Sequence, residues 1–244
     1  MSASISFQKI IGALSQSTID LFFPRACTGC TRPGTLLCQD CAKNIPRLKH
    51  QVCYQCQRVT TRFGEHCTEC PKTPLDAVFS ATCYQVPLMQ RLVHLYKYGF
   101  IRSLAEPLGI ILAQQLEKSA LPLPDIALAV PLHPRRLRFR GFNQSELLLQ
   151  ATARHALFPL TVTNGILLRT RYTKPQQKTR HKQERLENLV DAFTITDAAS
   201  IKGKTVWLFD DVATTHSTLL ACATALKHAG AKHVYGVVVA SVVR

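Results

Sequence analysis

The sequence contains no long hydrophobic run, although 46% of its 244 residues are apolar. No stretch approaches the ~20 apolar residues that a helix needs to span a bilayer, so we expect no transmembrane segment. Residues 5–23 are amphipathic and have neither the compact apolar stretch nor the small-residue cleavage site of a signal peptide. We therefore expect an amphipathic helix over residues 1–24 that docks on the protein's own body.

Acidic residues are also scarce, with 15 Asp and Glu against 30 Lys and Arg and a net charge of +15. Between residues 126 and 182 the only acid is Glu146. Such a field attracts polyanions, whether nucleic acid, anionic lipid or a phosphorylated substrate. The alternative is an ordinary solvated surface, but arginine dominates here and gathers in two expected loops. We predict contacts with pyrophosphate or DNA phosphates from Arg135, Arg136, Arg138, Arg140, Arg171, Lys174 and Arg180.

Cysteine, by contrast, is abundant, and most of the ten cysteines fall into C-x-x-C pairs. Each pair can place two thiolates on one metal ion, and two pairs complete a tetrahedral structural zinc site. Disulfides are the alternative, but Cys83 and Cys222 lie outside the pattern and no secretory signal is present, which favours a reducing compartment and metal. The sequence predicts about two structural Zn²⁺ ions, held by Cys27, Cys30, Cys38, Cys41, Cys53, Cys56, Cys67 and Cys70.

The pairing of these knuckles stays open at this point. The simplest assignment joins the first two pairs in one site and the last two in another, and cross-bracing of alternate pairs is the competing topology. His66, beside Cys67, could substitute as a ligand, although an exposed knuckle histidine is the simpler interpretation.

Composition divides the chain into three parts. After the helix of residues 1–24, residues 25–75 form a cysteine-dense zinc module that is too small to build its own core. Residues 76–244 alternate apolar strands with amphipathic helices, which predicts an α/β domain with a mainly parallel sheet flanked by helices. The expected strands are 78–86, 126–132, 166–168, 206–209 and 234–239, and the expected helices are 88–98, 104–116, 144–155 and 218–229.

The most informative segment is Val206–Leu219, in which an apolar run ends in Asp210 and Asp211 and small and hydroxyl residues follow. This pattern predicts a buried strand, a tight loop and a helix N-terminus. Backbone N–H groups at that helix end, with the hydroxyls of Thr214–Thr218 (the threonine loop), would cradle a phosphate. Acids at the carboxyl end of a strand lie where open α/β sheets bind ligands. A phosphate at one end and sugar hydroxyls at the other would fit a ribose 5-phosphate.

The segment resembles the loop by which type I phosphoribosyltransferases hold phosphoribosyl pyrophosphate (PRPP), with the pattern acid-acid-V-x-T-T-G-x-T. The resemblance implies that the acids hold the ribose hydroxyls, that the threonine loop holds the 5-phosphate, and that Mg²⁺ accompanies the pyrophosphate. The PRPP-binding residues would be Asp210, Asp211, Ala213, Thr214, Thr215, His216, Ser217 and Thr218.

One position departs from that pattern, because His216 stands where the glycine is expected. Glycine tolerates positive φ and the close approach of a phosphate. Histidine is also enriched in the left-handed region, so the turn can survive the replacement. Its ring could crowd the phosphate, or donate to it when protonated.

Two further motifs extend the resemblance. VPLHPRRLRFRGFNQS (residues 130–145) leaves a strand, passes several basic side chains, turns at Gly141 and enters a helix near Asn143. LLRTRYTKPQQKTRHKQERLENLVDAF (residues 167–193) crosses a second basic loop. Together with the zinc module and the threonine loop, these motifs resemble the ComF family of competence proteins, called GntX-like in some bacteria, over nearly the whole chain.

The ComF resemblance implies a phosphoribosyltransferase fold of the type I kind. It also implies a bacterial protein that handles incoming single-stranded DNA during natural transformation. Such a protein is cytoplasmic, or peripheral at the inner membrane through its partners, which are competence DNA-import and recombination proteins.

Two functions from different classes stay open. An enzyme would transfer a phosphoribosyl group, with Arg138 or Arg140 neutralising the leaving pyrophosphate, but its catalytic residues stay unassigned because no nucleobase site or general base can be named. A binding module would reuse the fold to grip single-stranded DNA. Its basic loops would follow the phosphates, and Phe139, Phe142 and Tyr172 would offer stacking faces unless they pack against the sheet. We favour the binding module, without dedicated turnover.

Overall fold

The computed structural model describes residues 25–60, 63–172 and 192–243. The expected helix of residues 1–24 lies outside the described residues, as do Lys174 and Arg180. The chain forms two compact units, residues 1–44 and residues 45–244. This division falls inside the expected zinc module of residues 25–75, because the second half of that module packs with the sheet of the larger unit.

In the smaller unit, the described residues form two cysteine knuckles and one short helix. The first knuckle closes through an antiparallel bridge between Ala26 and Pro33. Helix α2 (Gln39–Lys43) begins at Cys38, whose sulfur accepts the N–H of Cys41 at 3.4 Å. Two of the paired cysteines, Cys27 and Cys38, therefore also accept local backbone hydrogen bonds in this unit.

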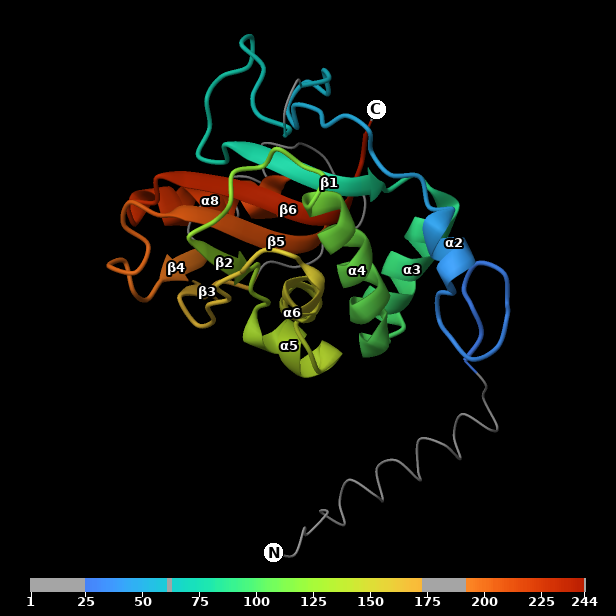
Figure 1. Cartoon of the computed structure of the whole chain (residues 1–244). Helices are drawn as coiled ribbons and strands as arrows, with labels where there is room; N and C mark the ends of the chain where they lie inside the picture. Colours follow the sequence, from blue (N-terminus) through green and yellow to red (C-terminus); the bar gives the residue numbers. More distant parts are fainter. Residues whose placement is uncertain (1–24, 61–62, 173–191, 244) are drawn as a thin grey trace, which may run out of the picture. The chain divides into compact units, whose positions relative to one another are not determined.

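The larger unit is built on a parallel sheet of four strands in the order β1-β6-β5-β2 (Figure 1). All three neighbouring pairs are parallel, which confirms the prediction of a mainly parallel sheet. The strands are β1 (Ala77–Cys83), β2 (Ile126–Ala129), β5 (Thr205–Ala213) and β6 (His233–Ser241).

Helices flank the sheet on both sides. Those of the larger unit are α3 (Pro87–Tyr98), the 3₁₀ turn η1 (Arg102–Leu104), α4 (Ala105–Leu116), α5 (Pro134–Arg140), α6 (Gln144–His155) and α8 (Ser217–His228). Helices α4 and α6 cross so closely that a Cβ at Gly109 would lie 2.5 Å from the Ala151 Cβ. Alternate residues of β5, including Val206 and Leu208, pack instead into a core that contains Leu219 and Leu226 of α8.

The first basic segment differs from the prediction, because it is a helix and not a loop. Arg135, Arg136, Arg138 and Arg140 all lie on α5. The sequence contains the physical reason. The His133 Nδ1 accepts the Arg135 N–H at 3.2 Å, Pro134 occupies the first turn, and Gly141 ends the helix at a φ of +76°.

The strand expected at residues 166–168 does not join the parallel sheet. It forms β3 (Leu167–Arg169), which pairs antiparallel with β4 (Phe193–Ile195) in a separate two-stranded sheet. Strand β5 is also longer than expected, since it continues through both acids to Ala213. Within the described ranges, no helix has the length and apolar character needed to cross a membrane.

Candidate functional site

The eight paired cysteines gather into two groups of four, and the groups follow the order of the sequence. One group is Cys27, Cys30, Cys38 and Cys41, the other is Cys53, Cys56, Cys67 and Cys70, and the sulfurs within each group lie within 4.8 Å of one another. Sequential pairing is therefore confirmed over cross-bracing. All ten cysteines are free thiols, which sets the disulfide alternative aside.

The sulfur geometry fits zinc in both groups. Tetrahedral Zn²⁺ with bonds of about 2.3 Å separates its sulfurs by about 3.8 Å, and the Sγ atoms of Cys30 and Cys38 lie 3.7 Å apart. In the second group the Cys56 and Cys67 Sγ atoms lie 3.4 Å apart. The two groups fit structural zinc sites and are called site 1 and site 2 below.

The four thiols of each site differ in pKa, because some are stabilised as thiolates and others hold a proton shared with a neighbouring thiol. Burial would raise the pKa of Cys27 and Cys53, but backbone N–H groups outweigh it and lower both to about 6. Hydrogen bonds with neighbouring thiols raise the pKa of Cys41 and Cys70 to about 12. Zinc would replace the protons that these thiols share.

His66 is not a zinc ligand, and it is half-buried where we expected an exposed knuckle residue. Its Nε2 lies 2.8 Å from the Leu75 carbonyl and its Nδ1 lies 2.9 Å from the Gln55 Nε2. The ring also packs against Tyr54, with centroids 5.2 Å apart. His66 therefore supports site 2 from outside its ligand set.

The threonine loop joins β5 to α8 and forms a small pocket. Asp210, Val212, Ala213 and Leu219 line this pocket together with all five loop residues. Its volume is ≈ 40 Å³. The predicted PRPP-binding residues are thus brought together around this pocket, except Asp211.

His216 adopts the left-handed conformation that the family glycine would take, with φ +60° and ψ 0°. It is the N-cap of α8 and its carbonyl accepts the Leu220 N–H at 2.9 Å. Its ring packs against Tyr54, with centroids 5.3 Å apart. Tyr54 lies between the site 2 ligands Cys53 and Cys56, so the second zinc knuckle contacts the threonine loop directly.

The two acids of β5 are held differently. The Asp210 Oδ1 accepts the Ser145 hydroxyl at 2.8 Å, and this carboxylate lines the loop pocket. Asp211 has a side chain that is only 2% exposed and forms an ion pair of 3.0 Å with Lys97 of α3. Asp210 therefore faces the space where a ligand would bind, whereas Asp211 ties the strand to α3.

Burial and the electrostatic interactions among Asp210, Asp211 and Lys97 shift the pKa values of Asp210 and Lys97. Burial, and next the Asp211 charge, raises the pKa of Asp210 to about 7. Burial lowers the pKa of Lys97, but the charges of Asp211 and Asp210 outweigh it, so the net shift is upward. The loop pocket thus has a carboxyl group that changes protonation near neutral pH, next to a firmly cationic lysine.

Helix α5 presents most of the expected phosphate contacts. Arg135 and Arg138 are exposed, while Arg136 and Arg140 are half-buried. The Arg140 Nη1 donates to the Gln144 Oε1 at 2.6 Å. Arg171 is also exposed, beyond the end of β3. The outer face of α5 therefore carries cationic groups that solvent can reach.

The three aromatic side chains near this helix behave differently. Phe142 is buried and packs on Tyr96 of α3 with ring centroids 5.8 Å apart, so it offers no stacking face. Phe139 is 81% exposed. Tyr172 is also exposed, and the Arg135 guanidinium lies 5.4 Å from its ring centroid. Phe139 and Tyr172 are thus exposed aromatic side chains beside the arginines.

Sequence reasoning did not identify Lys97, Ser145 or Tyr54 as parts of this site. A signal existed for Lys97, which follows Val93 at helical spacing on the buried face of α3. Ser145 and Tyr54 have no such signal, since their contacts join residues far apart in the sequence.

Comparison with known proteins agrees with this arrangement. A family model described as a double zinc ribbon domain matches residues 18–71. The DNA utilization protein YhgH of Salmonella typhi is 33% identical over 223 residues, covering 86% of this chain and 94% of the relative. Competence protein F of Haemophilus influenzae is 29% identical over 204 residues, covering 81% and 87%.

A more distant relative is the competence protein ComFC of Streptococcus pneumoniae, 27% identical over 201 residues, which cover 81% of this chain and 84% of the relative. The similarity thus spans most of this chain, and the family model covers the cysteines of both zinc sites. This chain belongs to the ComF/GntX family of competence and DNA utilization proteins.

Proposed function

We propose that this protein handles incoming single-stranded DNA during natural transformation and that its threonine loop binds a ribose 5-phosphate, as in PRPP. The observation that carries the proposal is helix α5, with solvent-accessible arginines beside two exposed aromatic rings. Relatives named for competence and DNA utilization support a role in DNA uptake.

The chemistry of α5 suits a single strand better than a duplex. Arginines at two exposed positions one helical turn apart, Arg135 and Arg138, can follow a phosphate backbone without reading sequence. Phe139 and Tyr172 can stack with unpaired bases, which a duplex would keep in its interior. Affinity would then depend strongly on salt, because each phosphate contact releases counterions.

The threonine loop would hold the 5-phosphate of PRPP at the N-terminus of α8, with Asp210 on the ribose hydroxyls and Mg²⁺ on the pyrophosphate. A second candidate function is an active phosphoribosyltransferase that acts on an unidentified nucleobase or nucleic-acid acceptor. Asp210 favours this candidate, since a pKa of about 7 suits a proton-transfer group at neutral pH.

The location that fits this proposal is the cytoplasm, where thiols stay reduced and available to zinc. There the protein would meet the incoming strand with competence DNA-import and recombination proteins as its partners.

A salt titration tests the proposal. Binding of a fluorescent oligo(dT) is measured from 50 to 200 mM salt for the wild type and for Arg135→Ala/Arg138→Ala. We expect the slope of log affinity against log salt to flatten by roughly 0.7 for each phosphate that the variant no longer neutralises. Arg91→Ala, which removes an exposed arginine from α3, is the matched control and should keep the wild-type slope. An unchanged slope in the double variant would contradict the assignment of α5.

A further inference from the structure

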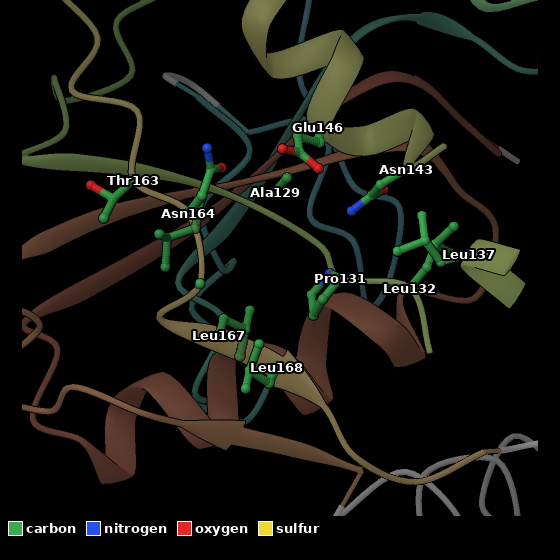
Figure 2. Close-up of a pocket in the computed structure, with 12 residues that line it drawn as sticks. Ala129, Pro131, Leu132, Leu137, Asn143, Glu146, Thr163, Asn164, Leu167 and Leu168 are labelled. Atoms are coloured by element: carbon green, nitrogen blue, oxygen red, sulfur yellow. The ribbon is translucent and has the colours of Figure 1, made fainter. Parts of the chain in front are cut away.

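A second pocket opens at the edge of the parallel sheet beside β2. We propose that it is a nucleobase subsite selective for guanine, with Glu146 reading the base edge; this rests on the proposed nucleic-acid function. Residues from β2, α5, α6, β3 and the loop at residues 163–165 line the pocket (Figure 2). It is distinct from the pocket of the threonine loop.

The size and walls of the pocket suit one flat ring system. Its volume is ≈ 190 Å³, below the about 300–1,000 Å³ typical of sites for whole drug-sized ligands and above the about 150 Å³ that holds a benzene ring. Leu167 and Leu168 lie along one side, and Glu146 lies on the opposite side in Figure 2. The pocket therefore offers apolar contact for the faces of a base and a polar group for one edge.

Glu146 is a distinctive side chain in this pocket, because it is the only acid between residues 126 and 182. It lies in the first turn of α6, yet the helix cap does not use it: the Asn143 Oδ1 accepts the Ser145 N–H at 3.1 Å instead. Across residues 25–60, 63–172 and 192–243, no hydrogen bond or ion pair engages its carboxylate. Both oxygens are thus available to a ligand.

The donor pattern of the bases selects guanine. An ionised carboxylate accepts hydrogen bonds and donates none. Guanine presents two adjacent donors on one edge, N1–H and the 2-amino group, so it can bond both oxygens at once. Adenine and cytosine place a ring acceptor beside their amino group, and thymine places its single N–H between two carbonyls. Among these bases, only guanine can donate to both carboxylate oxygens without placing one of its own acceptors against them.

The pocket is also connected to the surfaces that would hold the rest of a nucleotide. Ser145, the neighbour of Glu146, donates to Asp210 in the pocket of the threonine loop. Leu137 of α5 contributes to the wall of the base pocket, on the helix that carries the exposed arginines. A backbone held by α5 would therefore pass beside the mouth of the base pocket.

The test is a calorimetric titration of the whole protein with GMP, IMP, AMP, CMP and UMP. We expect GMP to bind about tenfold or more tightly than AMP, CMP or UMP, since a hydrogen bond to a charged group is worth about 1.5–3 kcal/mol. IMP, which lacks the 2-amino group, should lie between them. Glu146→Gln should abolish the preference for GMP. Leu168→Ala should weaken the binding of all five nucleotides but keep the preference for GMP.

Glu117→Gln is the matched control, because it removes the same charge from the exposed end of α4. Melting curves check that each variant is folded. Oligo(dT) carrying one internal guanine, compared with oligo(dT) alone, shows whether the pocket takes bases from a strand as well as from free nucleotides. Equal affinity for the five nucleotides, or a guanine preference that survives in Glu146→Gln, overturns the inference.

These outcomes separate the two proposals. If oligo(dT) binds with a steep salt dependence and no nucleotide is preferred, the base subsite is wrong and the proposed function stands. If oligo(dT) does not bind, the proposed function fails, and the GMP titration still decides the base subsite.

Discussion

The two zinc sites have the same four ligands and similar knuckles, but their surroundings differ. Site 1 belongs to the unit of residues 1–44, where the sulfurs of Cys27 and Cys38 also accept backbone N–H groups. Site 2 belongs to the unit that contains the sheet. The residue after the first cysteine shows the contrast: Thr28 bonds the nearby Leu36 carbonyl, whereas Tyr54 packs on His216 of the threonine loop.

This difference separates two uses of one motif. Site 1 folds a small segment that has too few residues for its own core. Site 2 does the same and also supports the residue at which this chain departs from the family glycine. The ring of His216 has a partner in Tyr54, which explains how a histidine is held at φ +60° in this loop.

The largest effect should come from removing one ligand at each site. Cys53→Ser should lose about one zinc per chain and destabilise the sheet unit, since structural zinc contributes on the order of 10 kcal/mol of folding free energy. Cys27→Ser should also lose about one zinc but leave the unfolding of residues 45–244 unchanged. Metal analysis with scanning calorimetry measures both. Equal destabilisation by the two substitutions would break the contrast.

Removing the buried ring of Tyr54 should have the next largest effect. Tyr54→Ala should destabilise the larger unit by about 3–5 kcal/mol, as for other large aromatic truncations in cores. Tyr54→Phe keeps the ring and removes only the hydrogen bonds of the hydroxyl with Thr73 and Leu75, so it should cost about 1 kcal/mol. Thr28→Ala, the corresponding change at site 1, is the control in urea unfolding. A Tyr54→Ala effect no larger than that of Thr28→Ala would argue against the supporting role of the ring.

The carboxyl group in the pocket of the threonine loop should make the folding stability depend on pH. The folded pKa of Asp210 is about 7, above its usual value of 3.8. Between pH 4 and 7 the folded state therefore holds a proton that the unfolded state has released, and stability falls as pH rises, by at most about 1.4 kcal/mol per pH unit. Asp210→Asn cannot titrate, so its stability relative to wild type should increase from pH 5 to pH 8. Urea denaturation measures the unfolding free energies. The same difference between Asp210→Asn and wild type at pH 5 and at pH 8 would refute this assignment.

The smallest effects should come from the exposed ion pairs beside the two sites, Arg32 with Asp40 and Arg58 with Glu69. All four side chains are more than half exposed, so solvent screens both pairs. Arg32→Ala and Arg58→Ala should each leave the melting temperature nearly unchanged. A large drop for Arg58→Ala alone would mean that surface charge, and not the packing of Tyr54, distinguishes site 2.

The sequence predicted those features that depend on local patterns. The bounds of α6 agree with the apolar spacing and with the Asn143 cap, and the C-x-x-C spacing predicted both zinc sites. Helix α5 was missed although Pro134 and Gly141 mark its ends, because the density of arginine was interpreted as a loop. The acids were placed after β5, but sheet pairing with β6 continues past them to Ala213.

What the sequence could not predict depends on contacts between distant segments. The ring of Tyr54 meets that of His216 only after the knuckle has packed against the loop. The pocket around Glu146 needs β2, α6 and β3 to meet at one edge of the sheet. No periodicity or motif within one segment specifies tertiary contacts of this kind.

The central claim is that the protein binds single-stranded DNA through its backbone and holds PRPP without dedicated turnover. The most direct measurement titrates wild-type protein with labelled oligo(dT) at 50 and 200 mM salt, in the presence of PRPP and Mg²⁺, while pyrophosphate release is followed in the same samples. Three phosphate contacts would weaken binding roughly 20-fold over this range, and pyrophosphate should stay at its spontaneous level. Binding that is absent or insensitive to salt, or steady pyrophosphate release, would contradict the account.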